Sequence, residues 1–168
     1  DAAGVAPDRF ERIDTSTEAS AAAARACHLA RSGELQILMK GSLHTDELMS
    51  AVVNHETGLR TQRRISHVFL FDLPRYSKML ALADCVVNIA PDIKAKRDIL
   101  GNAVELLQRL GIAQPKVGIV AAVDAVNPAI PATLHAQALV ELAAQGSWPG
   151  AIVEGPFGFD NAISREAA

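Results

Sequence analysis

The segment Gln36-Ile-Leu-Met-Lys-Gly-Ser-Leu-His-Thr-Asp-Glu47 combines an apolar run, a lysine-glycine pair and the chemistry of a helix start. Its apolar residues, Ile37 to Met39, predict a short strand that is buried on both faces. Thr45 is a residue type typical of a helix N-cap, and the two carboxylates after it suit a first helical turn. The pattern therefore predicts a strand that ends at Lys40-Gly41 and leads into a helix.

Lys40 and Gly41 would then lie outside the carboxyl end of a strand, where open α/β sheets bind their ligands. The N–H groups at the start of the next helix favour phosphate or carboxylate, and Lys40 would add a full positive charge. In the alternative interpretation, Gly41 only lets the chain turn and Lys40 is solvated, because a Lys-Gly pair is a weak signal by itself. The sequence leaves both interpretations open.

Predicted strands and helices alternate along the rest of the chain. Capping, proline and glycine signals predict helices at about 15–31, 46–54, 91–110, 131–146 and 160–168. Apolar runs predict strands at about 9–13, 35–39, 66–74, 80–87, 116–122 and 150–154, with 66–74 and 80–87 pairing as neighbours. This alternation predicts an α/β fold in which helices cover both faces of a largely parallel sheet.

The composition narrows the class of protein. The 168 residues are 49% hydrophobic and 21% charged, which suits a globular chain with a sizeable core. A net charge of −3 and an aromatic content of 4% argue against nucleic acid as a partner. The apolar runs are shorter than a membrane span and no signal peptide is expected, so we predict a cytoplasmic protein. Cys27 and Cys85 are interpreted as small core hydrophobes.

Polar residues follow the predicted strands at four places: Lys40 to His44, Asn88 with Asp92, Asp124 to Asn127, and Glu154 to Asp160. Because parallel strands end at one edge of a sheet, these groups are expected to face a common crevice. Taken singly, Asn88 and Asn127 are also ordinary turn or capping residues, and Asp160 is an ordinary N-cap. The spacing of these residues demands no metal site.

Six runs occur in order along the chain: Ile37-Leu-Met-Lys-Gly41, Gly58-Leu-Arg-Thr61, Ser66-His-Val68, Asn88-Ile-Ala-Pro-Asp92, Asn127-Pro with Pro131-Ala-Thr133, and Glu154-Gly-Pro-Phe-Gly-Phe-Asp-Asn-Ala162. Together they resemble the phosphate acetyltransferase and phosphate butyryltransferase family, and the butyryltransferase branch fits better. The resemblance implies a three-layer α/β/α fold related to the isocitrate and isopropylmalate dehydrogenases, usually in a homodimer. It also implies acyl transfer between coenzyme A and inorganic phosphate, without a metal or redox cofactor.

In the implied reaction, the thiol of coenzyme A attacks the carbonyl group of an acyl phosphate. Both substrates carry phosphate groups, so the site must bind several negative charges. Lys40 and Arg60 are the candidates for the anionic groups, with the N–H groups from Gly41 to Thr45 assisting. Three further polar candidates, whose contacts the sequence leaves open, are Asn88, Asn127 and Asp160.

The chain departs from the family pattern in two ways. Glu154 stands where the family usually has aspartate. Relatives also have a βα unit before the matched region and continue beyond it through a Ser-Arg pair and an acidic residue implicated in catalysis. The resemblance therefore implies one family domain over 1–168 that is incomplete at both ends and inactive by itself.

Two alternatives to this fragment of an active enzyme remain open. The first is a natural truncated module that binds coenzyme A or an acyl phosphate, or assembles with a partner, without catalysis. The second is a metal-dependent dehydrogenase relative, which is disfavoured because the chain has no evident cluster of acidic metal ligands.

Overall fold

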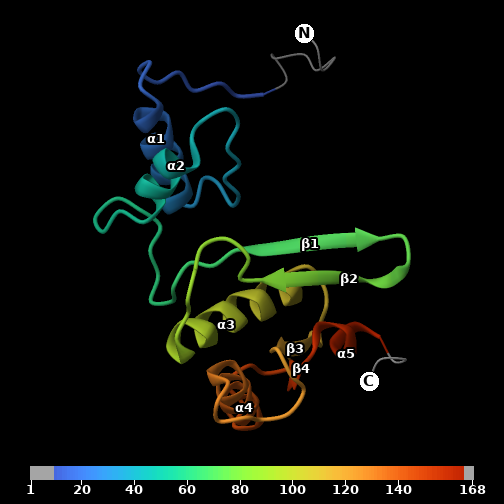
Figure 1. Ribbon diagram of the computed structural model, residues 1–168. Helices are drawn as coiled ribbons and strands as arrows, with labels where there is room; N and C mark the ends of the chain where they lie inside the picture. The colour runs from blue at the N-terminus through green and yellow to red at the C-terminus, as the bar shows by residue number, and fades with distance from the viewer. Residues whose placement is uncertain (1–9, 165–168) are drawn as a thin grey trace. The chain divides into compact units, whose positions relative to one another are not determined.

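The chain divides into two units, with the boundary between Arg63 and Arg64. The computed structural model describes residues 10–164 (Figure 1). Unit 1 comprises residues 1–63 and unit 2 comprises residues 64–168. The sequence predicts one family domain over this span, within which the structure separates two compact parts. In its described residues unit 1 consists of helices and loops, whereas unit 2 contains helices and strands.

Unit 1 is built from helices α1 (Ala19–Arg31) and α2 (Thr45–Val52), which pack against each other. Ala23, Cys27 and Leu29 of α1 are buried. The helix ends at Arg31 as predicted, because Gly33 adopts a φ of 82° that favours glycine. It begins later than the Thr15 capping signal predicts, since Glu18 is the N-cap residue and the Thr15 hydroxyl donates to the carbonyl oxygen of Ser16 instead.

The strand predicted at residues 35–39 is wrong. This segment is a loop in which Ile37 and Met39 are 83% and 93% exposed. An apolar run becomes a strand only when a neighbouring strand satisfies its backbone groups, and unit 1 has no strand among its residues 10–63. The strand predicted at 9–13 is also not formed at residues 10–13, and Arg9 lies outside the described residues.

Unit 2 begins with an antiparallel hairpin of β1 (Val68–Leu73) and β2 (Tyr76–Ala83), in which Phe69 is opposite Leu82. The pairing of these neighbours is confirmed. The second strand starts four residues before the predicted position (80–87), because Pro74 and Arg75 alone make the turn. Cys85, which follows β2, is exposed and is therefore not the core residue that the sequence suggests, whereas Cys27 is buried.

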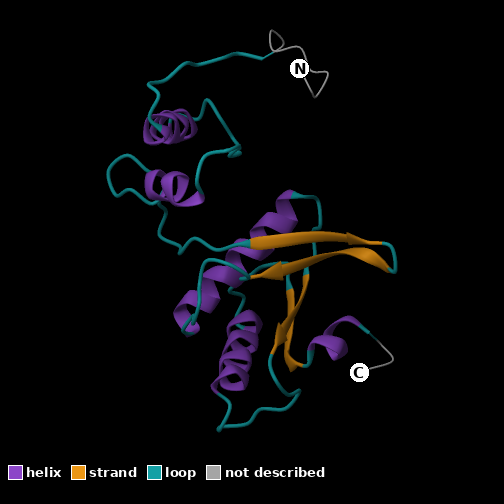
Figure 2. Ribbon diagram, turned by 45° about the horizontal axis from the view of Figure 1, so that its top comes forward, coloured by secondary structure: helices purple, strands orange, loops and turns teal. Residues whose placement is uncertain are grey.

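The α/β class is confirmed by the rest of unit 2. Strands β3 (Lys116–Val120) and β4 (Ile152–Phe157) form a parallel pair. Three helices complete the unit: α3 (Ile93–Arg109), α4 (Pro131–Ala144) and α5 (Phe159–Ile163). Figure 2 shows α4 beside the parallel pair. The strands described between residues 10 and 164 thus form two separate two-stranded sheets, one antiparallel and one parallel.

The core of unit 2 lies between α3, α4 and the parallel pair. Leu100 and Val104 of α3 pack there with Leu139 of α4 and Val153 of β4. Leu134 is 40% exposed, because the buried stripe of α4 runs through Thr133, Ala136 and Leu139.

The strand β3 alternates between exposed and half-buried residues. Its partner β4 has a register shift beside Gly155, which has a φ of 143°. A Cβ atom at Gly155 would lie 2.8 Å from the carbonyl oxygen of Ile119, so this close approach of the two backbones requires glycine. The parallel pair therefore depends on one glycine for its register.

Candidate functional site

The Lys40 segment is a loop that precedes α2. The Lys40 ammonium donates to the carbonyl oxygens of Leu43 and Gly41, at 3.1 and 3.4 Å. Gly41 is open, since a Cβ atom there would have no neighbour within 4 Å. Lys40 is exposed and closes its own loop, so the predicted strand-end geometry is wrong although the cation is accessible.

The helix after this loop starts one residue earlier than predicted. Thr45 is the first residue of α2, and His44 is the N-cap. The backbone N–H of His44 donates to the Glu47 carboxylate at 3.1 Å. Asp46 and Glu47 lie in the first turn as expected, where negative charge complements the helix dipole.

Arg60 lies in the loop that follows α2. Its guanidinium Nη1 is 2.7 Å from Nε2 of His55, and both side chains are exposed. No carboxylate between residues 10 and 164 pairs with Arg60. The guanidinium therefore keeps its full charge and several N–H donors for an anionic ligand.

The backbone of this loop is fixed by local hydrogen bonds. The Asn54 side-chain oxygen accepts from the N–H groups of Glu56 and Thr57, at 2.9 and 3.0 Å. The N–H of Gly58 donates to the Asn54 carbonyl oxygen, and Leu59 donates back to α2. Arg31 of α1 also donates to the Glu56 carbonyl oxygen. Arg60 is thus presented on an ordered turn.

Asn88 in unit 2 has a structural role. Its amide nitrogen donates to the Asp84 carboxylate at 2.5 Å and to the Ile65 carbonyl oxygen at 3.1 Å. Both partners are acceptors, which fixes the orientation of the amide. The side-chain group of Asn88 that remains for a ligand is therefore its oxygen, which accepts hydrogen bonds and cannot donate one to an unprotonated phosphate oxygen.

Asp84 is the centre of this network, although the sequence analysis assigns no role to it. Its carboxylate also accepts from the backbone N–H groups of His67, Val86 and Val87. Partial burial by itself raises the pKa of Asp84, but these hydrogen bonds, with Asn88 first among them, outweigh burial and lower the pKa to about 2. Asp84 therefore joins the end of β2 to the start of β1.

Asn127 precedes α4 in a turn that Thr133 organises. The Thr133 hydroxyl is fully buried, accepts from the Asn127 N–H at 2.9 Å and lies within hydrogen-bond distance of the Asn127 and Ile130 carbonyl oxygens. The Asn127 side-chain oxygen accepts from the Ala129 N–H. Asn127 therefore has the turn role that the sequence allowed as an alternative. Its side-chain amide nitrogen is the group that remains available to a ligand.

Asp160 lies in the first turn of α5 and is exposed. The next residue, Asn161, donates to Asp124 at 3.5 Å. Asp124 follows β3 and Asn161 follows β4, so the loops after these two parallel strands meet at one edge. Asn127 and Asp160 lie in these same segments after β3 and β4, as the strand pattern predicts for this pair of strands.

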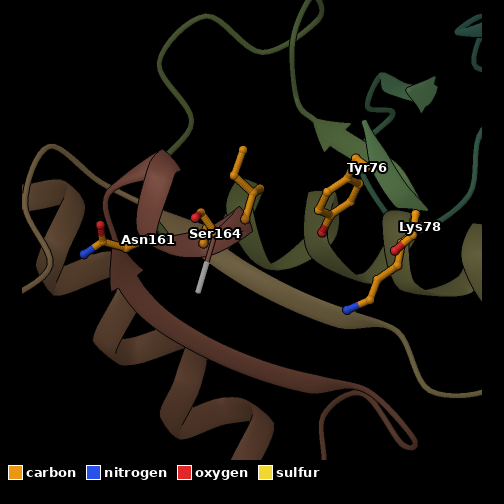
Figure 3. Close-up of a pocket in the computed structure, with 7 residues that line it drawn as sticks. Tyr76, Lys78, Asn161 and Ser164 are labelled. Carbon is orange, nitrogen blue, oxygen red and sulfur yellow. The ribbon is translucent and has the colours of Figure 1, made fainter. Parts of the chain in front are cut away.

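A hollow of about 440 Å³ lies between the start of β2 and the α5 segment (Figure 3). Its lining residues are Tyr76, Ser77, Lys78, Asn161, Ala162, Ile163 and Ser164. The sequence did not indicate it, because residues 75–79 lie between the two strands that the sequence predicts. Lys78 is the one cationic side chain among these lining residues.

The structure places the predicted site residues in both units. Lys40, Gly41, Thr45 and Arg60 belong to unit 1, whereas Asn88, Asn127 and Asp160 belong to unit 2. Asn88 follows β2, which is in the antiparallel sheet, so it does not share the edge of β3 and β4. Asp84 could have been suspected from the sequence, since aspartate commonly binds backbone N–H groups two residues later. Nothing local marks His55.

Two further observations concern only residues 10–164. No group of three or more His, Cys, Asp or Glu side chains in this range is arranged to hold a metal ion. No helix in the same range has the length and apolar character to cross a membrane.

Comparison with known proteins identifies relatives over almost the whole chain. A family model described as phosphate acetyl/butaryl transferase matches residues 9–168. The phosphate acetyltransferase of Rhizobium meliloti is 52% identical over 160 residues, which cover 95% of this chain and 50% of that protein. The phosphate butyryltransferase of Clostridium acetobutylicum is 38% identical over 147 residues, or 88% of this chain and 49% of that protein. The sequence predicts a better fit to the butyryltransferase branch, but of these two relatives the acetyltransferase is the more similar to this chain.

A solved structure is also similar. The branched-chain phosphotransacylase from Enterococcus faecalis V583 aligns with a TM-score of 0.79 and 32% identity, covering 94% of this chain and 59% of that chain. The chain spans about half the length of the curated relatives it matches.

Proposed function

Because the chain belongs to the phosphate acetyl/butaryl transferase family, we propose that the protein carrying it transfers an acetyl or butyryl group between coenzyme A and inorganic phosphate. In the direction of acyl-CoA formation, the sulfur of coenzyme A forms a bond to the acyl carbon. The bond from that carbon to the phosphate oxygen breaks, and the thiol proton leaves to a base. Inorganic phosphate is the leaving group.

The observation that carries this proposal is the presentation of Arg60 on an ordered loop without a carboxylate partner in the described residues. A guanidinium group matches the geometry of phosphate and can bind two of its oxygens. Lys40 would supply a second cation. A positive field also helps the nucleophile, since an unperturbed thiol has a pKa of about 8.5 and is mostly protonated at neutral pH.

We further propose the cofactor requirement, location, assembly and polar contacts of this protein. Coenzyme A is a substrate, and no metal or redox cofactor takes part. The protein is a cytoplasmic homodimer. Asn127 and Asp160 contact substrate, whereas Asn88 contributes at most an acceptor oxygen. No residue of this chain is assigned as the catalytic base.

Thioester formation tests the reaction directly. The protein carrying this sequence is incubated with coenzyme A and acyl phosphates from acetyl to hexanoyl, and the ultraviolet absorbance of the thioester is followed. We expect turnover with short acyl chains in the presence of a metal chelator. Absence of turnover with every acyl phosphate contradicts the proposal, and binding of coenzyme A without turnover supports the non-catalytic module instead. In the same assay the expectation for residues 1–168 alone is no turnover.

Arg60→Ala is expected to raise the KM for the acyl phosphate or coenzyme A by about tenfold, because a charge-assisted contact to phosphate is lost. Arg60→Lys should restore little, since an ammonium cannot make the two-pronged contact. The melting temperature should stay unchanged. Arg25→Ala, which removes an exposed arginine of α1, is the matched control. An unchanged KM in Arg60→Ala would exclude this residue from the site.

Lys40→Ala is expected to raise the same KM severalfold with little change in melting temperature, because an exposed lysine adds little to stability. Steady-state kinetics and thermal unfolding measure the two effects. Lys94→Ala on the exposed side of α3 is the control. If KM does not move, Lys40 only closes the loop through the Leu43 carbonyl oxygen.

A further inference from the structure

We propose that His55 is a positioning residue for Arg60, and this inference rests on the proposed function of Arg60 as an anion-binding group. The two side chains are in direct contact, with 2.7 Å between Nη1 of Arg60 and Nε2 of His55. A guanidinium can only donate hydrogen bonds. Nε2 of His55 is therefore the acceptor in this contact.

An imidazole nitrogen, unlike a carboxylate, holds the arginine without cancelling its charge. A carboxylate in the same place would fix the guanidinium equally well but would compete with an incoming phosphate or carboxylate ligand. The imidazole uses one N–H donor of Arg60 and leaves the others available. The pair is thus suited to a fixed cation that still attracts anions.

The backbone around the pair does not depend on the imidazole. Asn54, Gly58 and Leu59 fix the turn through hydrogen bonds that do not involve the His55 side chain. Arg31 of α1 holds the same turn at Glu56. His55 and Arg60 come from the two ends of this ordered loop, so their contact restricts the rotamers of an otherwise mobile arginine side chain. Restricting them before binding lowers the entropy cost of binding a ligand.

The test is a double-mutant cycle on the protein carrying this sequence, with KM for acyl phosphate and coenzyme A as the main readout. His55→Phe keeps a ring but removes the acceptor, and should raise KM by about two- to fivefold with kcat unchanged, as for the loss of an exposed polar pair. His55→Gln, whose amide oxygen can accept from Arg60, should recover most of this loss. In the Arg60→Ala background, His55→Phe should have no further effect.

His28→Phe is the matched control, because His28 is exposed on α1 and makes no described side-chain hydrogen bond. If Arg60→Ala raises KM and His55→Phe does not, the positioning role is wrong and the function of Arg60 stands. If Arg60→Ala has no effect, the proposed role of Arg60 fails. If the effects of the two substitutions on KM are additive, the inference is also overturned. If His55→Phe lowers the melting temperature, the KM values of His55→Ala and His55→Gln are judged by the same criteria.

Discussion

Gly58→Ala is expected to disrupt the turn after α2 and to destabilise unit 1 strongly. A Cβ atom at Gly58 would lie 2.5 Å from the carbonyl oxygens of both Asn54 and Val52, and 2.8 Å from that of Ala51. All these atoms are backbone, so no side chain can move aside. The hydrogen bonds that Gly58 and Leu59 donate to this helix end would break. We expect a loss of about 3 kcal/mol in the free energy of unfolding.

For a unit of this size, such a loss lowers the melting temperature by more than about 10 °C. Thermal unfolding followed by circular dichroism measures it, and hydrogen exchange of the α1 and α2 amides locates it in unit 1. The control is Gly41→Ala, where the new Cβ atom has no neighbour within 4 Å. Because the turn also carries Arg60, KM should rise in the Gly58 variant. Equal stability of the two variants would show that the turn is not packed as described.

Asp84→Asn is expected to have a similarly large effect on unit 2. The Asp84 carboxylate accepts from the His67, Val86 and Val87 N–H groups and from the Asn88 amide, with both oxygens in use. An asparagine amide group has one oxygen, so its nitrogen would face N–H donors whichever way it turns. Donors left unsatisfied at a half-buried site should cost about 2–3 kcal/mol, which lowers the melting temperature by about 10–15 °C.

The pH dependence of stability gives an independent check on Asp84. Its pKa is about 2 in the folded protein and about 3.9 in an unfolded chain. A depressed folded pKa stabilises the protein above the unfolded value, and this contribution is lost as the pH falls from about 4 to about 2. Asp84→Asn should therefore flatten the acid limb of the stability curve. Asp72→Asn, at an exposed position of β1, should leave it unchanged.

Local signals in the sequence were sufficient for most helices and for the hairpin. Pro131 begins α4 and Gly146, with a φ of 85°, ends it. Asp92 caps α3 by accepting from the Ala95 N–H at 2.7 Å. These features act within one turn of the chain, so they are visible without tertiary structure. The family was likewise visible, because ordered motifs do not require a fold to be recognised.

Tertiary structure alone decided which apolar runs became strands and which polar groups remain available. Residues 37–39 have the composition of a buried strand, yet they are an exposed loop because a strand forms only where a partner satisfies its backbone. Asn88 looked like a ligand contact, but its N–H groups are used by Asp84 and Ile65. His55 carried no signal, because its contact with Arg60 depends on a turn that the side-chain pattern does not encode.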